Sequence, residues 1–499
     1  MTHVSQHWRE VAVNCGLLWR WPQVLGVRPE WTNLMLVRSK KSSIFLRAQL
    51  YTPSAHALEA CLLVLAQIRR LGEIHLSGDG RSIGMLLNSV EDGAPRLKSL
   101  ILSNSGWKAD AETPALEKSF LQEGAPTLER LELRKCALPW DAPLLKSCFK
   151  LQTLVVDGLE SNRASLPQFL GILRHVSHLR VLRLENIVPA AQGLFEHDDD
   201  TSLPDLEELY LSGPTSDITA LLANVIFPPP TSLSLRCTCS ERPDELPLLR
   251  DALSAHLNTP HSALPPRSLH ISLDAVQITV HANATERIVE NESLWDVAAR
   301  GSVSVTLVAG PDTLHTPAVF GTLVHAFALQ DVRALLLDDY EGFLDELLVG
   351  DLLRKTPNLQ TVHARHDAAS PVVTALMLDG VSPRPERAEM LLPRLETLIL
   401  EEVDMNWSFD DTPFMQALQQ AQYLRCLHGC PVDELRVKRC MNVGQGDIRT
   451  LCHLFAEVDW DAFEAYVTDA DSENDSGEAW PDDGVWTGYW EYEAYGWHS

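Results

Sequence analysis

Basic residues are scarce in this chain of 499 residues, which has 41 Lys and Arg against 68 Asp and Glu and a formal net charge of −27. Nucleic-acid binding needs a basic surface that neutralises phosphates, and no basic stripe offsets the acidic excess. Long hydrophobic runs are also missing, since no stretch approaches the ~20 apolar residues that span a bilayer. The composition therefore predicts neither a nucleic-acid nor a membrane partner.

Features of secreted proteins are missing as well. Residues 1–8 contain no apolar segment like that of a secretory signal peptide. The ten cysteines are scattered, and only Cys426 and Cys430, with Cys440 and Cys452 further along, suggest a metal set. Zinc sites need about four converging ligands, usually in two CxxC-like pairs, so structural cysteines are favoured. We expect reduced thiols, no metal, no cofactor and a cytoplasmic and/or nuclear location.

A short phrase with aliphatic residues at its first, fourth and sixth positions recurs along most of the chain. The clearest copies are Leu97/Leu100/Leu102, Leu128/Leu131/Leu133, Leu151/Leu154/Val156, Leu179/Leu182/Leu184, Leu206/Leu209/Leu211 and Leu395/Leu398/Leu400. Their spacing is close to the leucine-rich-repeat period of about 20–29 residues. Helical segments precede the phrases, so each unit would contain a helix, a turn, a strand and a loop. The pattern predicts an α/β leucine-rich-repeat solenoid, a horseshoe with a parallel sheet on the concave side and helices outside.

The repeats are expected to cover residues 54–440, with an irregular part at about 230–330. In that part Leu233, Leu269 and Val303 still mark strands at near-repeat spacing. The loops between these strands are long and rich in Pro and His. We therefore expect irregular repeats there.

Different patterns flank the repeats. Residues 23–53 are predicted to be a linker, with a helix over 30–39 and a strand over 42–50. In 441–468, apolar residues at helical spacing predict a helix that caps the open end of the core. Residues 469–499 contain Asp and Glu interleaved with Trp and Tyr and no Lys or Arg. That composition indicates a disordered acidic aromatic tail.

The chain opens on an apolar helical segment followed by a Leu-Trp pair. The segment contains, in order, His3, Val4, His7, Trp8, Arg9, Val11 and Ala12, and the pair is Leu18 and Trp19. This stretch resembles the final helix of the F-box-like motif of fungal F-box proteins. Because the match starts at that last helix, residues 1–22 are expected to be an F-box-like remnant, truncated at its N-terminal side.

The resemblance implies an adaptor function. In F-box proteins of this type the F-box binds Skp1 within a cullin–RING ubiquitin ligase, and the leucine-rich repeats hold the substrate protein. By resemblance, the candidates for contact with Skp1 are Val4, Trp8, Val11, Leu18 and Trp19. The alternative is a free-standing leucine-rich-repeat protein without ligase recruitment. In either case we expect a monomer outside a complex.

Residues between and after the leucines should point onto the concave face, because strand side chains alternate. The candidate ligand contacts are Arg130, Glu132, Arg134, Arg183, Glu185, Glu208, Tyr210, Arg236, His363 and Arg365. Arg and Tyr are the residue types that often dominate binding energy at interfaces. We therefore expect a protein ligand to dock between Arg130 and Tyr210.

Catalytic motifs are weak. The glycines at 78, 80 and 84 have GxGxxxG spacing, which differs from that of a nucleotide-binding turn and fits a repeat loop. His363, His366 and Asp367 cluster after a strand, but no nucleophile is placed beside them. Acid pairs such as 338/339 and 401/402 are interpreted as solvated loop carboxylates. We expect no enzyme, and a hydrolase built on residues 230–330 is the remote alternative.

Overall fold

The computed structural model describes most of the chain up to residue 465. The described residues are 5–90, 92–105, 116–137, 139–158, 163–191, 201–229, 231–239, 245–257, 265–285, 302–308, 316–378, 390–406, 408–409 and 412–465. Val4 and the tail at 469–499, both named above, lie outside these residues. Within them, no helix combines the length and the apolar character needed to cross a bilayer.

The described residues contain one large sheet of sixteen strands. In spatial order its strands are β1 (Ile44–Leu50), β2 (Leu71–Gly78), β3 (Ser99–Asn104), β4 (Arg130–Arg134), β5 (Thr153–Asp157), β6 (Val181–Glu185), β8 (Glu208–Pro214), β10 (Ser232–Thr238), β13 (Val303–Val308), β12 (Gln277–Asn283), β11 (Ser268–Leu273), β14 (Ala334–Asp339), β15 (Thr361–His366), β16 (Thr397–Glu401), β19 (Glu434–Lys438) and β20 (Glu457–Trp460). Every neighbouring pair is parallel except the two that involve β12. Two short pairs lie apart from it, β7 (Thr201–Ser202) with β9 (Val225–Ile226) and β17 (Ser408–Phe409) with β18 (Thr412–Pro413).

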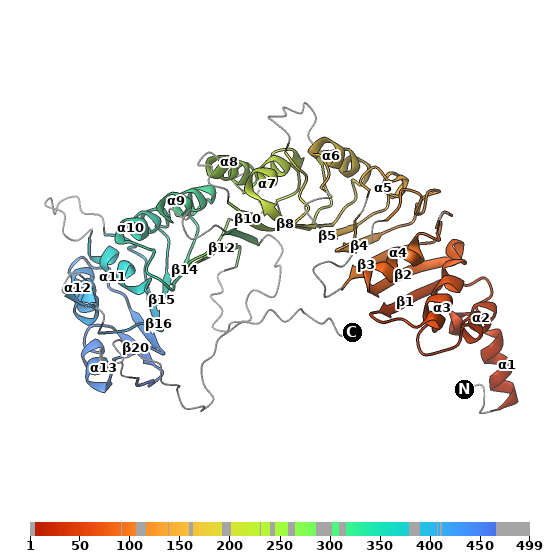
Figure 1. The fold of residues 1–499 in the computed structure, drawn as a ribbon. Coiled ribbons are helices and arrows are strands. Elements are labelled where there is room, and N and C mark those ends of the chain that lie inside the picture. The colour runs from red at the N-terminus through yellow and green to blue at the C-terminus, as the bar shows by residue number, and fades with distance from the viewer. Residues whose placement is uncertain are drawn as a thin grey trace, which may run out of the picture.

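Helices connect most of the strands and lie on one side of the sheet (Figure 1). They are α1 (Gln6–Asn14), α2 (Pro29–Arg38), α3 (Ala55–Leu65), α4 (Gly80–Leu87), α5 (Pro143–Ser147), α6 (Leu166–His175), α7 (Thr215–Leu222), α8 (Glu245–Leu257), α9 (Thr316–Ala326), α10 (Glu346–Lys355), α11 (Ala369–Leu378), α12 (Phe414–Leu427) and α13 (Gln445–Leu451). The elements follow an arc, with the helices along its outer side and the strands along its inner side (Figure 1). The expectation of a mixed α/β chain with a large, mostly parallel sheet is confirmed.

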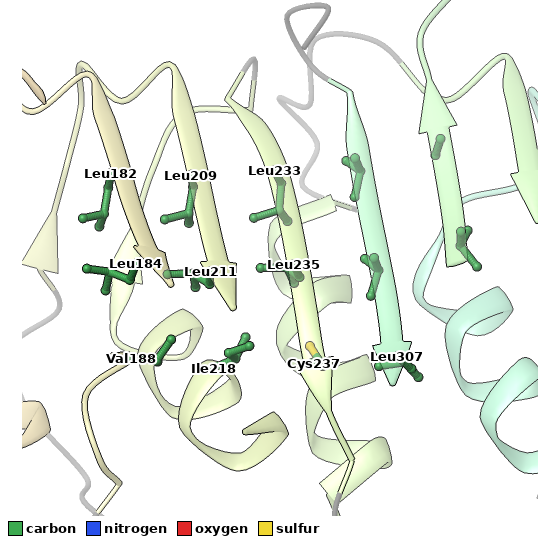
Figure 2. Close-up of a cluster of buried hydrophobic side chains, with 14 of the residues drawn as sticks. Leu182, Leu184, Val188, Leu209, Leu211, Ile218, Leu233, Leu235, Cys237 and Leu307 are labelled. Atoms are coloured by element: carbon green, nitrogen blue, oxygen red, sulfur yellow. The ribbon is translucent and has the colours of Figure 1, made fainter. Parts of the chain in front are cut away.

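The repeated leucines form continuous rows between the sheet and the helices. Leu131, Leu154, Leu182, Leu209 and Leu233 are register partners on successive strands, and all are buried. Figure 2 shows three residues of this row, Leu182, Leu209 and Leu233, with Leu184, Leu211 and Leu235 of the next row beside them and helices below. Because each strand adds its leucines to the rows and the helices cover them, one elongated core extends through the molecule.

The central part departs from simple repetition. The three strands expected there form, but β13 rather than β11 pairs with β10. The hairpin β11–β12 lies beyond β13, and β12 is antiparallel to both of its neighbours. Asp274 makes the hairpin turn, because its carboxylate accepts hydrogen bonds from the backbone N–H groups of Val276 and Gln277 at 2.9 Å each.

Both ends of the sheet differ from the expected boundaries. The expected linker forms α2 and β1, and β1 is the first strand of the sheet. At the other end the expectation of a continuous capping helix was wrong, because α13 ends at Leu451 and the chain then forms β20. Strand β20 pairs in parallel with β19 and so satisfies edge N–H and C=O groups that a helix would leave unpaired. Leu451 and Phe455 are still buried against the core.

Candidate functional site

The inner face is the face of the sheet that points away from the helices. On β4, for example, Leu131 and Leu133 point into the core, whereas Arg130 and Arg134 point out and are exposed. All ten predicted contact residues lie on this face, on β4, β6, β8, β10 and β15: Arg130, Glu132, Arg134, Arg183, Glu185, Glu208, Tyr210, Arg236, His363 and Arg365. The alternation of strand side chains placed them there, as the sequence predicted.

Arg130 and Arg134 share one buried carboxylate. Arg130 Nε donates to Glu132 Oε1 at 2.5 Å, and Arg134 Nη2 lies 3.7 Å from Glu132 Oε2. Glu132 is only 5% exposed, whereas both arginine side chains are about half exposed. Glu132 therefore orients the two guanidinium groups, and only the arginines can contact a ligand.

Arg183 and Tyr210 are register partners on β6 and β8. Arg183 pairs with Glu208 of the neighbouring strand. Burial raises the pKa of the Tyr210 phenol, and the nearby charge of Glu185 raises it further. Tyr210 therefore keeps its proton at neutral pH and can donate a hydrogen bond to a ligand.

Arg236 differs from the other inner-face arginines. Its register partners are Ser212 on β8 and Thr306 on β13, and its side chain is exposed. It makes no ion pair with any residue that the structure describes. Among the described residues, therefore, no carboxylate pairs with the positive charge of Arg236.

His363 and Arg365 belong to an ion-pair network across β14, β15, β16 and the residue after β19. Arg365 Nε lies 3.2 Å from Glu401 Oε2, and its Nη1 lies 3.5 Å from Asp338 Oδ2. His363 Nε2 lies 2.9 Å from the same oxygen of Glu401, and Arg439 pairs with that carboxylate too. The side chains of Asp338 and Glu401 are only 5% and 13% exposed. The interpretation of these acids as solvated was wrong, because neighbouring strands bring basic side chains over them.

The pKa of Glu401 reflects this network. Burial alone would raise that pKa, but the His363 and Arg439 side chains that contact the carboxylate outweigh burial. Together with the charge of Arg365 they bring the pKa of Glu401 down from 4.5 to about 2. The network is therefore held together by charge-assisted contacts, and its groups are largely committed to one another.

His366 ends β15 in a left-handed conformation with φ 53°. Its Nδ1 lies 2.8 Å from Asp338 Oδ1, its Nε2 lies 2.9 Å from Glu402 Oε2, and the Tyr340 ring packs 4.2 Å from its own. A cavity of about 390 Å³, which Ser370 also lines, lies beside it. Because both imidazole nitrogens face carboxylates, neither is left to activate the Ser370 hydroxyl. Sequence reasoning missed this arrangement, since its residues come from segments that are far apart in the sequence, at the ends of β14, β15 and β16 and in α11.

The other two motifs have structural roles. Gly78 and Gly80 flank Asp79, whose carboxylate accepts from Ser82 N at 3.1 Å and caps α4. All cysteines are free, and burial raises the pKa of Cys440 to about 12. In the described part of the chain, no three His, Cys, Asp or Glu side chains converge to hold a metal ion.

The N-terminal segment exposes large apolar side chains. Trp8, Val11, Leu17 and Leu18 are 58%, 43%, 63% and 57% exposed, and together they form what we call the N-terminal apolar surface. Trp19, the remaining predicted contact that the structure describes, is half-buried. Its indole Nε1 donates to the carbonyl of residue 12 at 2.7 Å, and the guanidinium of residue 38 stacks 4.5 Å from its ring. Trp19 therefore holds α1 in place.

A scan of protein-family models gives no match, and a search of curated proteins gives no significant similarity. Functional inference therefore depends on the chemistry of the inner face and of the N-terminal apolar surface.

Proposed function

We propose that the protein is a binding adaptor of the leucine-rich-repeat type, a solenoid that holds a protein ligand on its inner face. By the resemblance of its N-terminus, we further propose that it recruits Skp1 and through it a cullin–RING ubiquitin ligase. The ligand is then the protein to be ubiquitinated. The long inner face lined by charged and aromatic side chains is the observation that carries the binding function.

The inner face has the composition of an interaction surface. Arg130, Arg134, Arg183, Tyr210 and Arg236 lie on four closely spaced strands and project from a rigid backbone. Arg and Tyr are enriched among residues that dominate binding energy, because they combine hydrogen bonding with large contact area. Fixed strands also reduce the entropy lost when a ligand binds.

The N-terminal apolar surface supports a second partner. Exposing several large apolar side chains in one short segment is unfavourable in water, and such patches commonly mark protein interfaces. The register of α1 places Trp8 and Val11 one turn apart on a helix, and Leu17 and Leu18 follow at its end. This arrangement favours a partner that buries one helix face, as the F-box resemblance implies for Skp1.

Skp1 binding is tested with the full chain and purified Skp1 in a quantitative capture assay. Leu18→Glu should weaken capture by about 30-fold, because it places a carboxylate in an apolar contact. A contact that is a binding hot spot contributes ~2 kcal/mol, which corresponds to this change in affinity. Leu347→Glu, on the exposed side of α10, is the matched control and should leave capture unchanged. If the unmodified chain does not capture Skp1, ligase recruitment is wrong and a free-standing binding protein remains.

Ligand binding by the inner face is tested separately. A protein captured by the full chain and identified by mass spectrometry should lose affinity by about tenfold with Arg183→Glu, since inverting one charge-assisted contact costs ~1.4 kcal/mol or more. The same charge change at Arg354, which is exposed on α10, should have no effect. Equal affinity for both variants would contradict the assignment of the ligand site.

A further inference from the structure

Four adjacent strands at the centre of the sheet, β10, β13, β12 and β11, present no carboxylate on the inner face among their described residues. We call the inner face of these four strands the carboxylate-free window. Its floor consists mainly of hydroxyl groups, such as those of Ser234, Ser304, Thr306 and Thr279. Carboxylates return on both sides of the window, on β8 and on β14.

The window combines this floor with an available positive charge. Arg236 projects from β10 without an ion pair to a described residue, whereas Arg183 and Arg365 on either side are paired. A guanidinium that is not engaged in an ion pair binds carboxylates strongly. In a chain with a net charge of −27, an acidic ligand is attracted to Arg236 here and meets no carboxylate on these four strands.

Two histidines add an aromatic surface to the window. The rings of His270 and His281 stack with centroids 5.8 Å apart on neighbouring strands. Burial lowers the pKa of His270 to about 3 and that of His281 to about 4, so both are neutral at physiological pH. They therefore contribute aromatic rings but no charge.

We propose that the carboxylate-free window binds the chain's own C-terminal tail, residues 469–499. The tail contains nine Asp and Glu, seven Trp and Tyr and no Lys or Arg. Its carboxylates match Arg236 and the hydroxyl groups, and its aromatic rings match the guanidinium face and the stacked imidazoles. The composition of the tail thus complements that of the window.

The length of the tail permits this contact. The described chain ends at Ala465, just after β20, which is the last strand of the sheet. Eight strand spacings of ~4.8 Å separate β20 from β10, or about 38 Å along the sheet. Residues 466–480 alone span up to ~50 Å when extended, so the aromatic part that follows can lie across the window. Because it is covalently attached, the tail acts at a high effective concentration.

The bound tail would then compete with other ligands for the inner face. This competition rests on the proposed function of that face in ligand binding, whereas the contact between the tail and the window does not rest on it. A ligand that uses the window must displace the tail, so its apparent affinity is lower for the full chain than for a chain with a neutralised tail.

The contact is tested in the isolated full-length chain by photo-crosslinking. A benzophenone amino acid replaces Thr238, an exposed inner-face residue at the end of β10, and in a control chain it replaces Met85 on the outer side of α4. The expected result is crosslinks from position 238, but not from 85, to peptides within 469–499.

Arg236→Glu should reduce the yield of these crosslinks roughly tenfold. Raising the salt from ~0.1 M to ~1 M should also reduce the yield, because the screening length falls from ~10 Å to ~3 Å. The control substitution Arg354→Glu should leave the yield of these crosslinks unchanged.

Mixing the chain with an isotope-labelled copy identifies the source of the tail. Crosslinks confined to one isotope support the intramolecular contact, whereas mixed-isotope pairs at the statistical frequency would assign the tail to a second copy and overturn it. Absence of tail peptides from position 238, or equal yields from both positions, would also overturn it. None of these outcomes bears on Skp1 capture, so the failure of either proposal can be recognised separately.

Discussion

At the scale of single residues, the carboxylate of Glu401 is strongly stabilised in its charged form. It accepts contacts from His363 on β15 and from Arg439 after β19, so it joins three consecutive strands. A buried carboxylate without these partners would be costly, whereas one with good partners favours its ionised form. The depressed pKa of Glu401, about 2, is the expression of that balance.

Glu401→Gln should lower the free energy of unfolding by ~1–2 kcal/mol near neutral pH. This is less than the ~3 kcal/mol equivalent of the full pKa difference, because part of the carboxylate still contacts solvent. Since the folded-state pKa lies below the ordinary 4.5, the contribution is complete above that pH and disappears as pH falls towards 2. Urea titrations at several pH values should show the two chains converging over this range.

The control for this experiment is Glu185→Gln, at an exposed inner-face carboxylate that makes no ion pair with a described residue. That change should stay within ~0.5 kcal/mol at every pH. A constant difference between wild type and Glu401→Gln across the titration would show that the residue acts through packing rather than charge.

At the scale of elements, the junction between β2 and α4 depends on a glycine. Gly78 has φ 139°, and a Cβ atom on it would lie 2.3 Å from the carbonyl carbon of Leu50 on β1. This close approach lets Asp79 N donate to Leu50 O at 2.9 Å, so the first strand is tied to the second where α4 begins. The glycine therefore serves strand packing, which is compatible with the repeat loop that its GxGxxxG spacing favoured over a nucleotide-binding turn.

Gly78→Ala should destabilise the chain by ~3 kcal/mol, because the new methyl group meets backbone atoms that cannot move aside. Gly171→Ala is the matched control. Gly171 lies in α6 with no atom within 4 Å of the added Cβ, so the change should stabilise the chain by up to ~1 kcal/mol. Chemical denaturation measures both, and equal effects of the two substitutions would contradict the proposed role of Gly78.

At the scale of the whole molecule, shape follows from stacking. Each strand pairs with a neighbour while helices fill the outer side, and because helices are wider than the spacing of strands, the stack bends towards the strands (Figure 1). A curved stack exposes one long strand face instead of burying it in a closed globule. The inner face is thus a property of the whole arrangement and not of any one unit.

Small-angle scattering should therefore give a radius of gyration clearly above the ~23 Å expected for a compact globule of this length. The pair-distance distribution should be asymmetric, with a long tail. A globular protein of similar mass measured under the same conditions provides the reference. A radius near the compact value would contradict the curved arrangement and with it the open inner face.

Local pattern was enough to predict the leucine rows and the ten inner-face residues, because alternation along a strand is a property of a few consecutive residues. It was also enough for α2 and β1. It could not predict whether an inner-face acid would be exposed, since that depends on the side chains that adjacent strands bring alongside, as Arg365 and Arg439 do for Glu401.

Tertiary structure alone decided the centre of the molecule. Nothing in the spacing of Leu269 or Val303 indicated that β13 would pair with β10, or that β12 would lie between antiparallel neighbours, because pairing between distant segments is set by the competition of all strands for edges. That rearrangement places β13, β12 and β11, which have no inward-facing carboxylates, beside β10 and its Arg236. The sequence determines which residues the carboxylate-free window contains, but only the pairing of the strands in the fold assembles them into one surface.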